Sequence, residues 1–169
     1  VNTLDNTPAI IHTTIVPGNQ IKMKIASKGG GSENMSKVTM LTPADGIEGV
    51  KKLVLDQIFY AGGKPCPPII VGIGIGGNLE KSALLAKEAI LRDLADQSPD
   101  ETIAQLEKDL YKEINKLGVG PMGVGGETTC LAVKINYFPI PFLRVSLVLH
   151  YFACLVHQYF LFACRFLRV

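Results

Sequence analysis

From residue 69 the sequence reads Ile69-Ile70-Val71-Gly72-Ile73-Gly74-Ile75-Gly76-Gly77. The apolar run at its start is typical of a buried β-strand, and the glycines after it contain a G-x-G-x-x-G pattern ahead of a helical stretch. A dinucleotide-binding fold requires a second strand soon after that helix, whereas here a second helix begins near Ser98. We therefore expect an α/β fold without a nicotinamide site.

Three helices are predicted from apolar residues at helical spacing. The first begins at Thr42-Pro43 and ends at Gly62-Gly63, the second covers about residues 80–94, and the third begins at a capping box over residues 98–101 and ends at Gly118. The expected buried residues are Ile47, Val50, Val54 and Ile58 in the first helix, Ala83, Leu84, the stem of Lys87, Ile90 and Leu91 in the second, and Ile103, Leu106, Leu110, Ile114 and Leu117 in the third.

Strands are predicted at both ends of this helical region. Residues 21–25 alternate apolar and polar side chains with a period of two, residues 9–13 are a second candidate, and Pro17-Gly18-Asn19 supplies the turn between them. A further strand is expected from Thr129 to Ile135, with Cys130 in the core. Together these elements predict an α/β fold with a mixed sheet flanked by helices and glycine-rich loops.

Charge and composition divide the chain near Asn136. The net charge of +2 is too small to indicate a nucleic-acid partner. All 15 acidic residues and all 17 glycines lie at or before Glu127, whereas nine of the 12 aromatic residues lie between Tyr137 and Phe166. We therefore expect one domain over residues 1–136 and an apolar, aromatic-rich tail over residues 137–169.

The tail contains 20 residues, 145–164, without Asp, Glu, Lys or Arg, and it is expected to be helical. Its length would suit a membrane span, but His150, His157 and Gln158 would be costly in lipid, so a membrane is not the expected partner. A helix would place His150, Cys154 and His157 on one face, a spacing that suits either a metal site or an ordinary buried face.

The cysteines and the amino end bear on the compartment. The four cysteines form no CxxC pair, and no signal-peptide pattern is present, so we expect a reducing compartment, the cytoplasm. The chain begins at Val1 within a polar segment, so we expect further sequence upstream of it.

Glycine is concentrated in three segments that are expected to be loops, at residues 29–31, 72–77 and 118–126. Glycine at this density lets backbone N–H groups approach a ligand without obstruction by side chains. Tight turns would account for any one of these segments. Three in one domain favour backbone crowded around a common site.

Four motifs occur in a fixed order along the first 136 residues. They are Pro8-Ala9-Ile10-Ile11-His12-Thr13, Lys28-Gly29-Gly30-Gly31-Ser32-Glu33-Asn34, Cys66-Pro67-Pro68 with the glycines of 72–77, and Gly120-Pro121-Met122-Gly123-Val124-Gly125-Gly126-Glu127-Thr128-Thr129. Together they resemble the alpha-type catalytic domain of the iron–sulfur hydro-lyases, the family of class I fumarases and L(+)-tartrate dehydratase. The resemblance implies reversible hydration and dehydration of a small dicarboxylate, fumarate/malate or tartrate/oxaloacetate, with an oxygen-sensitive 4Fe-4S cluster held by three cysteines.

The resemblance also implies roles for individual residues. Cys66 matches the middle cluster ligand, with a buried structural thiol as the rival interpretation. The residues that resemble the substrate-pocket loop are Gly29, Gly30, Gly31 and Ser32. Glu33 is either a polar contact in that pocket or a solvated acid, and Gly74, Gly76 and Gly77 are expected to let a turn pack near the cluster. Cys154 lies roughly where the third ligand would fall, although its neighbours do not match that motif, and His12 is expected to make an ordinary polar contact.

The sequence departs from this family at three points. The Cys-Gln-Asp segment with the first cluster cysteine does not occur in it, the resemblance ends near Asn136, and the beta-type subunit or domain that supplies arginines and a lysine is not included. We hypothesise that residues after Asn136 are not the family's sequence, because of a shifted reading frame, an unspliced segment or a truncated gene. Two functions remain open. One is part of a hydro-lyase that works with a beta-type partner in a homo- or hetero-oligomer, and the other is an inactive remnant or membrane-tethered binding module that keeps the fold.

Overall fold

The computed structural model describes residues 4–5, 9–139 and 145–153, with the side chains given up to Pro139. It divides into two units, and the described residues up to Ile25 belong to the first unit and those from Ala26 onward to the second. All the helices and strands of the described residues belong to the second unit.

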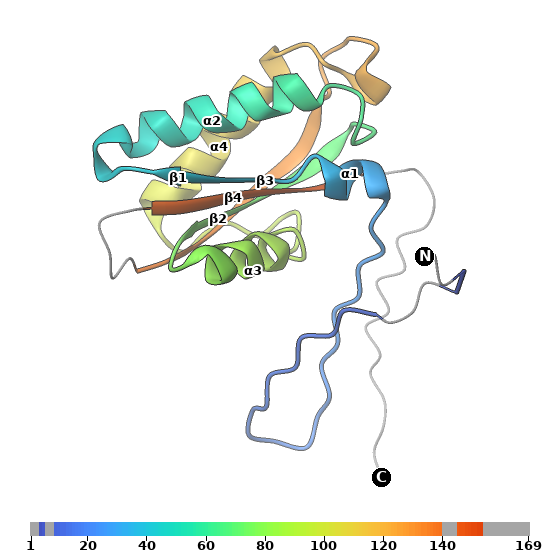
Figure 1. Ribbon diagram of the computed structural model, residues 1–169, viewed down its shortest axis with the longest axis vertical. Coiled ribbons are helices and arrows are strands. Elements are labelled where there is room, and N and C mark those ends of the chain that lie inside the picture. The colour runs from blue at the N-terminus through green and yellow to red at the C-terminus, as the bar shows by residue number, and fades with distance from the viewer. Residues whose placement is uncertain (1–3, 6–8, 140–144, 154–169) are drawn as a thin grey trace. The chain divides into compact units, whose positions relative to one another are not determined.

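Residues 9–25 of the first unit form no strand, so the two strands expected at 9–13 and 21–25 are wrong. The expected turn is present as a bend over residues 17–19, where the segment doubles back on itself (Figure 1). Ile10, Ile21 and Met23 are 86%, 81% and 54% exposed. Two extended segments without a further strand or a helix to cover their apolar side chains are at best marginally stable as a sheet in water.

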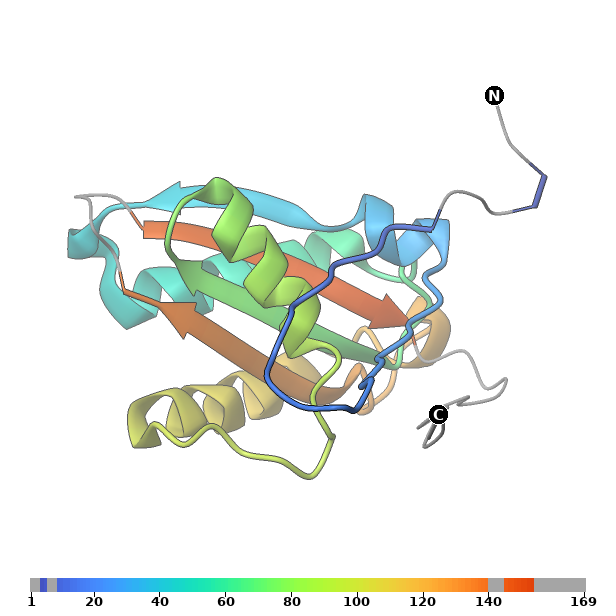
Figure 2. The same cartoon turned by 90° about the horizontal axis from the view of Figure 1, so that it is seen from below.

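A four-stranded mixed sheet forms the centre of the second unit, in the order β1-β4-β2-β3. Its strands are β1 (Lys37–Leu41), β2 (Ile69–Gly76), β3 (Cys130–Phe138) and β4 (Val145–Ala153). β2 runs parallel to β3, and β4 runs antiparallel to both β1 and β2. α2 (Gly46–Ala61) and α4 (Glu101–Lys116) cover one face of the sheet, and α3 (Leu79–Ala89) covers the other (Figures 1 and 2). The predicted mixed sheet flanked by helices is confirmed.

β4 lies in the segment that was expected to be helical, so that expectation is wrong for residues 145–153. A strand between two neighbours in a sheet covered on both faces usually carries a continuous apolar run. The lack of charge that suggested a helix therefore suits a central strand equally well. Among the described residues, no helix is long and apolar enough to cross a membrane.

The three long helices follow polar residues, as predicted for α2 and α4, whereas the cap of α3 was not predicted. A short 3-10 turn, η1 (Pro43–Asp45), precedes α2, and the carboxylate of Asp45 accepts from the Thr42 N–H at 2.6 Å. Asn78 caps α3. The cap of α4 is Asp100, whose Oδ1 accepts from two N–H groups of the first turn, so α4 begins after Asp100 and not at the expected capping box from Ser98.

Gly72 and Gly74 lie inside β2, so most of the expected loop at 72–77 is strand. A Cβ added to Gly74 would overlap the Ser82 carbonyl oxygen and lie 2.7 Å from the Ala86 nitrogen of α3. Because α3 lies so close to β2, the residues of α3 that face the sheet are mostly small. The buried residues of α3 are Ser82, Leu85, Ala86 and Ala89, so the buried face expected from Ala83 and Leu84 is displaced by about one residue.

β3 is an edge strand, and side chains from outside the sheet satisfy its outer backbone. The carboxylate of Glu107, on α4, accepts from the Ile135 N–H at 2.7 Å and from Arg92 Nη1 at 2.9 Å. Arg92 Nη1 also donates to the Ile135 carbonyl oxygen at 3.0 Å. The side chain of Glu107 is 8% exposed. This network closes the outer edge of β3 to pairing with another strand.

Asp96 makes the stability of this edge depend on pH. Arg92 Nε donates to both oxygens of Asp96, at 3.0 and 3.1 Å, and hydrogen bonding to Arg92 lowers the pKa of the Asp96 carboxyl, with the charges of Arg92 and Lys134 adding to the effect. Stability from a carboxyl with a lowered pKa is complete above its unfolded value of about 3.9 and is lost as the pH falls through the folded value. We expect the free energy of unfolding in urea to fall on acidification below about pH 5, and to fall less in Asp96→Asn. Identical pH dependence in the two proteins would contradict this assignment.

Candidate functional site

Cys66 lies in the loop of residues 62–68, which joins α2 to β2. Its side chain is half-buried, and the prolines on either side of it, Pro65 and Pro67, are buried. The backbone of Cys66 has a φ of 57°, a left-handed conformation that is uncommon for a residue with a side chain. Backbone strain of this kind clusters at functional sites, which favours Cys66 as a candidate ligand.

The first glycine-rich segment packs directly against this loop. It forms a single helical turn, α1 (Gly30–Asn34), and not the open loop that was expected. A Cβ on Gly31 would overlap the carbonyl oxygen of Lys64, so only glycine allows α1 to approach the Cys66 loop this closely. Gly29, Gly30 and Gly31 are exposed, whereas Ser32 is buried and its hydroxyl donates to the Gly29 carbonyl oxygen at 2.9 Å.

The segment of residues 118–126 packs against the same loop. It contains the 3-10 turn η2 (Pro121–Gly123), and the Met122 N–H donates to the Pro67 carbonyl oxygen at 2.8 Å. A Cβ on Gly63 would lie 2.6 Å from the Met122 carbonyl oxygen, so the two loops touch through backbone. Two of the three glycine-rich segments therefore meet at Cys66.

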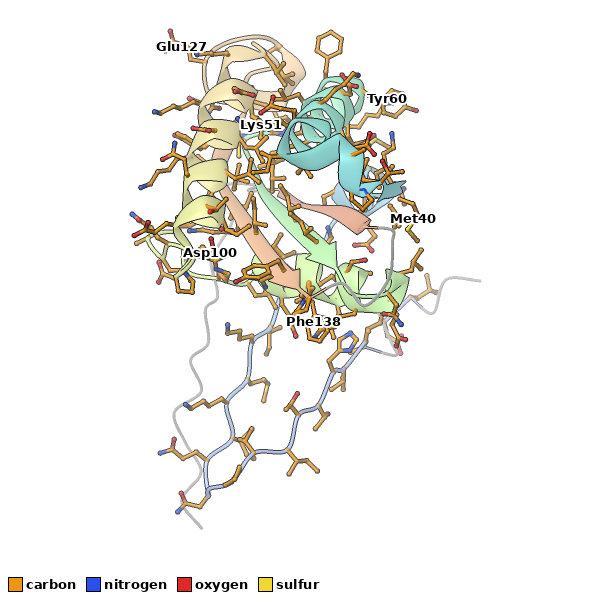
Figure 3. The ribbon with its side chains drawn as sticks, turned by 90° about the vertical axis from the view of Figure 1, so that its left-hand side faces the viewer. Met40, Lys51, Tyr60, Asp100, Glu127 and Phe138 are labelled. Carbon is orange, nitrogen blue, oxygen red and sulfur yellow. The ribbon has the colours of Figure 1, made fainter. Side chains whose placement is uncertain are left out.

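The third glycine-rich segment lies at the opposite end of β2. Cys66 precedes the first residue of β2, and Gly76 is the last, paired in register with Phe138. Figure 3 shows Tyr60 and Glu127, near the ends of α2 and of the 118–126 segment, at one end of the unit, with Phe138 at the other. A strand of this length spans roughly 23 Å. The expectation that Gly74, Gly76 and Gly77 pack near the Cys66 site is therefore wrong, and Gly74 and Gly77 instead lie against α3.

Glu33 joins α1 to charged side chains on either side of it. Its carboxylate lies 3.3 Å from Lys28 Nζ and 3.1 Å from Lys87 Nζ, so it bridges the segment before α1 to α3. Burial lowers the pKa of Lys28, and the charge of Glu33 offsets part of that effect. Of the two alternatives for Glu33, the structure shows an acid in an ion-pair network and not a freely solvated one.

The other candidates lie in the first unit, in the strands of the second unit or outside the described residues. His12 is exposed in the first unit, and Cys130 is buried in the core, where burial raises the pKa of its thiol to about 12. His150 belongs to β4, while Cys154 and His157 lie outside the described residues. Within the part of the chain that is described, no three His, Cys, Asp or Glu side chains converge as a metal site would require. Cys66 can thus supply one thiolate, and the further thiolates of an iron–sulfur cluster would have to come from elsewhere.

Three polar residues hold the site together in roles that were not predicted. Gln57, on α2, donates to the Met35 carbonyl oxygen at 2.9 Å and so holds the end of α1. Asn115, on α4, accepts from the N–H groups of Thr129 and Cys130, each at 2.8 Å. Thr129 in turn accepts from the Gly120 N–H at 3.0 Å. An Asn or Gln in a helix carries no sequence signal for such a role, because its partners are backbone groups distant in sequence.

Comparisons with known proteins give this chain several relatives. Over 117 residues the chain is 54% identical to a Methanocaldococcus jannaschii protein provisionally named L(+)-tartrate dehydratase subunit alpha. The matched residues make up 69% of this chain and 41% of that protein. It is also 33% identical over 135 residues to the L(+)-tartrate dehydratase subunit alpha of Escherichia coli strains UTI89 and K12. The matched residues make up 80% of this chain and 45% of those proteins.

The chain thus spans less than half the length of the relatives that it matches. Its match to a family model, described as fumarate hydratase (Fumerase), runs over residues 1–151. That match, like strand β4, continues beyond Asn136, where a boundary between two parts is predicted. Since the match covers most of the sequence, this chain belongs to the fumarate hydratase (Fumerase) family.

Proposed function

We propose that this chain is part of the alpha portion of a 4Fe-4S-dependent hydro-lyase that hydrates or dehydrates a small dicarboxylate, fumarate/malate or tartrate/oxaloacetate. The observation that carries the proposal is the Cys66 loop, held between α1 and the 118–126 segment through contacts that only glycine permits. A thiol fixed in this way is suited to ligate a metal, because little of its freedom remains to be lost on binding. The names of the relatives support the reaction class.

Residues of this chain would bind both the cluster and the substrate. Cys66 would give one thiolate to the cluster, whose iron without a protein ligand acts, when bound, as a Lewis acid toward the substrate hydroxyl. The exposed backbone of Gly29, Gly30 and Gly31, beside the Cys66 loop, would contact a substrate carboxylate, and the buried Ser32 would fix their turn. Lys28, Lys87 and Glu33 sum to one positive charge next to α1, which attracts a dicarboxylate.

A partner would complete the site. The relatives are named alpha subunits, which supports a beta-type subunit or domain as the source of the remaining substrate contacts. The proposal therefore places the chain in a homo- or hetero-oligomer, and an oxygen-sensitive cluster favours the cytoplasm. Cys154 stays a proposed third ligand.

The experiment grafts residues 1–151 of this chain onto the archaeal relative in place of the matching segment and produces the hybrid with its beta-type partner. After anaerobic loading with iron and sulfide, we expect hydration of fumarate or dehydration of tartrate, lost in Cys66→Ala and kept in Cys130→Ala, because Cys130 is completely buried in the core. The complex without the graft is the positive control. A rate that Cys66→Ala leaves unchanged would contradict the assignment of Cys66. A cluster-loaded hybrid that acts on neither dicarboxylate, while the control does, would contradict the substrate class.

A further inference from the structure

We propose that Thr129 is a positioning residue for Cys66 and acts on it through the 118–126 segment. The inference rests on the proposed function in one respect only, which is that Cys66 serves as a cluster ligand. The position of the Cys66 loop is a property of the chain itself and can be measured without metal.

Thr129 is anchored to the core of the second unit. It is completely buried, its N–H donates to Asn115 Oδ1 at 2.8 Å, and its carbonyl oxygen accepts from the Ile69 N–H at 3.0 Å. These contacts tie it to α4 and to the first residue of β2. Its hydroxyl oxygen is therefore a fixed acceptor at the start of β3.

The hydroxyl of Thr129 holds the beginning of the 118–126 segment. Thr129 Oγ1 accepts from the N–H of the buried Gly120 at 3.0 Å. The segment is closed on itself, since the Gly123 N–H donates to the Gly120 carbonyl oxygen at 3.0 Å and the Gly125 N–H donates to Val119 at 2.9 Å. A displacement at Gly120 would consequently move the whole segment.

The same segment touches the Cys66 loop two residues later. The Met122 N–H donates to Pro67, the residue directly after Cys66, at 2.8 Å. Gly63 packs against the Met122 carbonyl at the other side of the loop. A continuous set of contacts thus runs from Asn115 through Thr129 and Gly120 to the residues on both sides of Cys66.

Thr129→Val tests this connection with almost no change in side-chain shape. Valine leaves the buried Gly120 N–H without an acceptor, which favours detachment of the segment from the Cys66 loop. Thr129→Ser keeps the hydroxyl and should restore the wild-type behaviour. Cys130, the next residue along β3, reports on general loosening of the core because its thiol is completely buried.

The measurement is the alkylation rate of each cysteine by iodoacetamide in the full 169-residue chain, free of metal, quantified by peptide mass spectrometry. We expect Thr129→Val to alkylate about five-fold faster at Cys66, with Thr129→Ser close to wild type and the Cys130 rate unchanged in both. Hydrogen exchange at the Met122 N–H should accelerate in Thr129→Val by a similar factor.

Two outcomes would overturn the proposal. One is a Cys66 rate that Thr129→Val leaves at the wild-type value. The other is equal acceleration at Cys66 and Cys130, which would mean that Thr129 stabilises the fold as a whole. Iron uptake is measured separately in the hybrid complex, so a hybrid that takes up no iron would count against the proposed function, while the expected alkylation pattern in the 169-residue chain would leave the role of Thr129 standing.

Discussion

Gly74→Ala should destabilise the second unit by on the order of 3 kcal/mol or more, because the added Cβ has no space between β2 and α3. It would overlap the Ser82 carbonyl oxygen and lie 2.7 Å from the Ala86 nitrogen, and both neighbours are backbone atoms of a packed helix. Relief of the overlap requires α3 to move away from the sheet, which would open contacts along its whole buried face. The measurement is the free energy of unfolding in urea.

Gly29→Ala is the matched control for this substitution. Gly29 has a φ of −77°, which any residue adopts, and nothing lies within 4 Å of the position that its Cβ would take. Its variant should stay within about 0.5 kcal/mol of wild type. If Gly74→Ala proved as stable as Gly29→Ala, the close packing of α3 on β2 would be refuted.

Glu107→Ala should cost about 3–5 kcal/mol, because it removes one partner of a buried ion pair. The carboxylate lies 2.9 Å from Arg92 Nη1 and 2.7 Å from the backbone nitrogen of Ile135. Alanine leaves the Arg92 charge without this partner and exposes the Ile135 N–H on the edge of β3. Glu107→Gln keeps an acceptor for one of the two donors and should fall between Glu107→Ala and wild type.

Glu88→Ala is the control for this second substitution, since Glu88 is an exposed glutamate on α3. Its variant should change the free energy of unfolding in urea by no more than about 0.5 kcal/mol. A Glu107→Ala protein as stable as Glu88→Ala would show that the network contributes nothing measurable to the edge of β3.

Sequence patterns predicted the helices better than the strands. The apolar spacing of α2 and α4 is long enough to be distinctive, and Val50, Val54 and Ile58 are confirmed as buried, whereas Ile47 is exposed. The alternation at 21–25 is equally regular, but a strand requires a partner, and a local pattern carries no information about partners. β4 was missed for a related reason, since a continuous apolar run suits a helix and a central strand alike.

The candidate site was predicted in part. Three glycine-rich segments were expected around a common site, and two of them lie against the Cys66 loop. The third segment was wrongly predicted to be a loop at the same site. A glycine in a sequence does not show whether it allows a loop conformation or makes room for a packed helix, as Gly74 does for α3. Thr129 and Asn115 were missed because each acts through backbone groups that only the folded chain brings within reach.

The central claim is that Cys66 holds iron at a site built from α1 and the 118–126 segment. The most direct test is anaerobic loading, with iron and sulfide, of the hybrid that carries residues 1–151 in the archaeal relative and is produced with its beta-type partner, followed by iron analysis and visible absorbance. We predict that the hybrid and its Cys130→Ala variant bind iron and show cluster absorbance, and that the Cys66→Ala hybrid, folded by circular dichroism, binds less iron and loses that absorbance. Equal iron and absorbance in the Cys66→Ala hybrid and the unsubstituted hybrid would contradict the account.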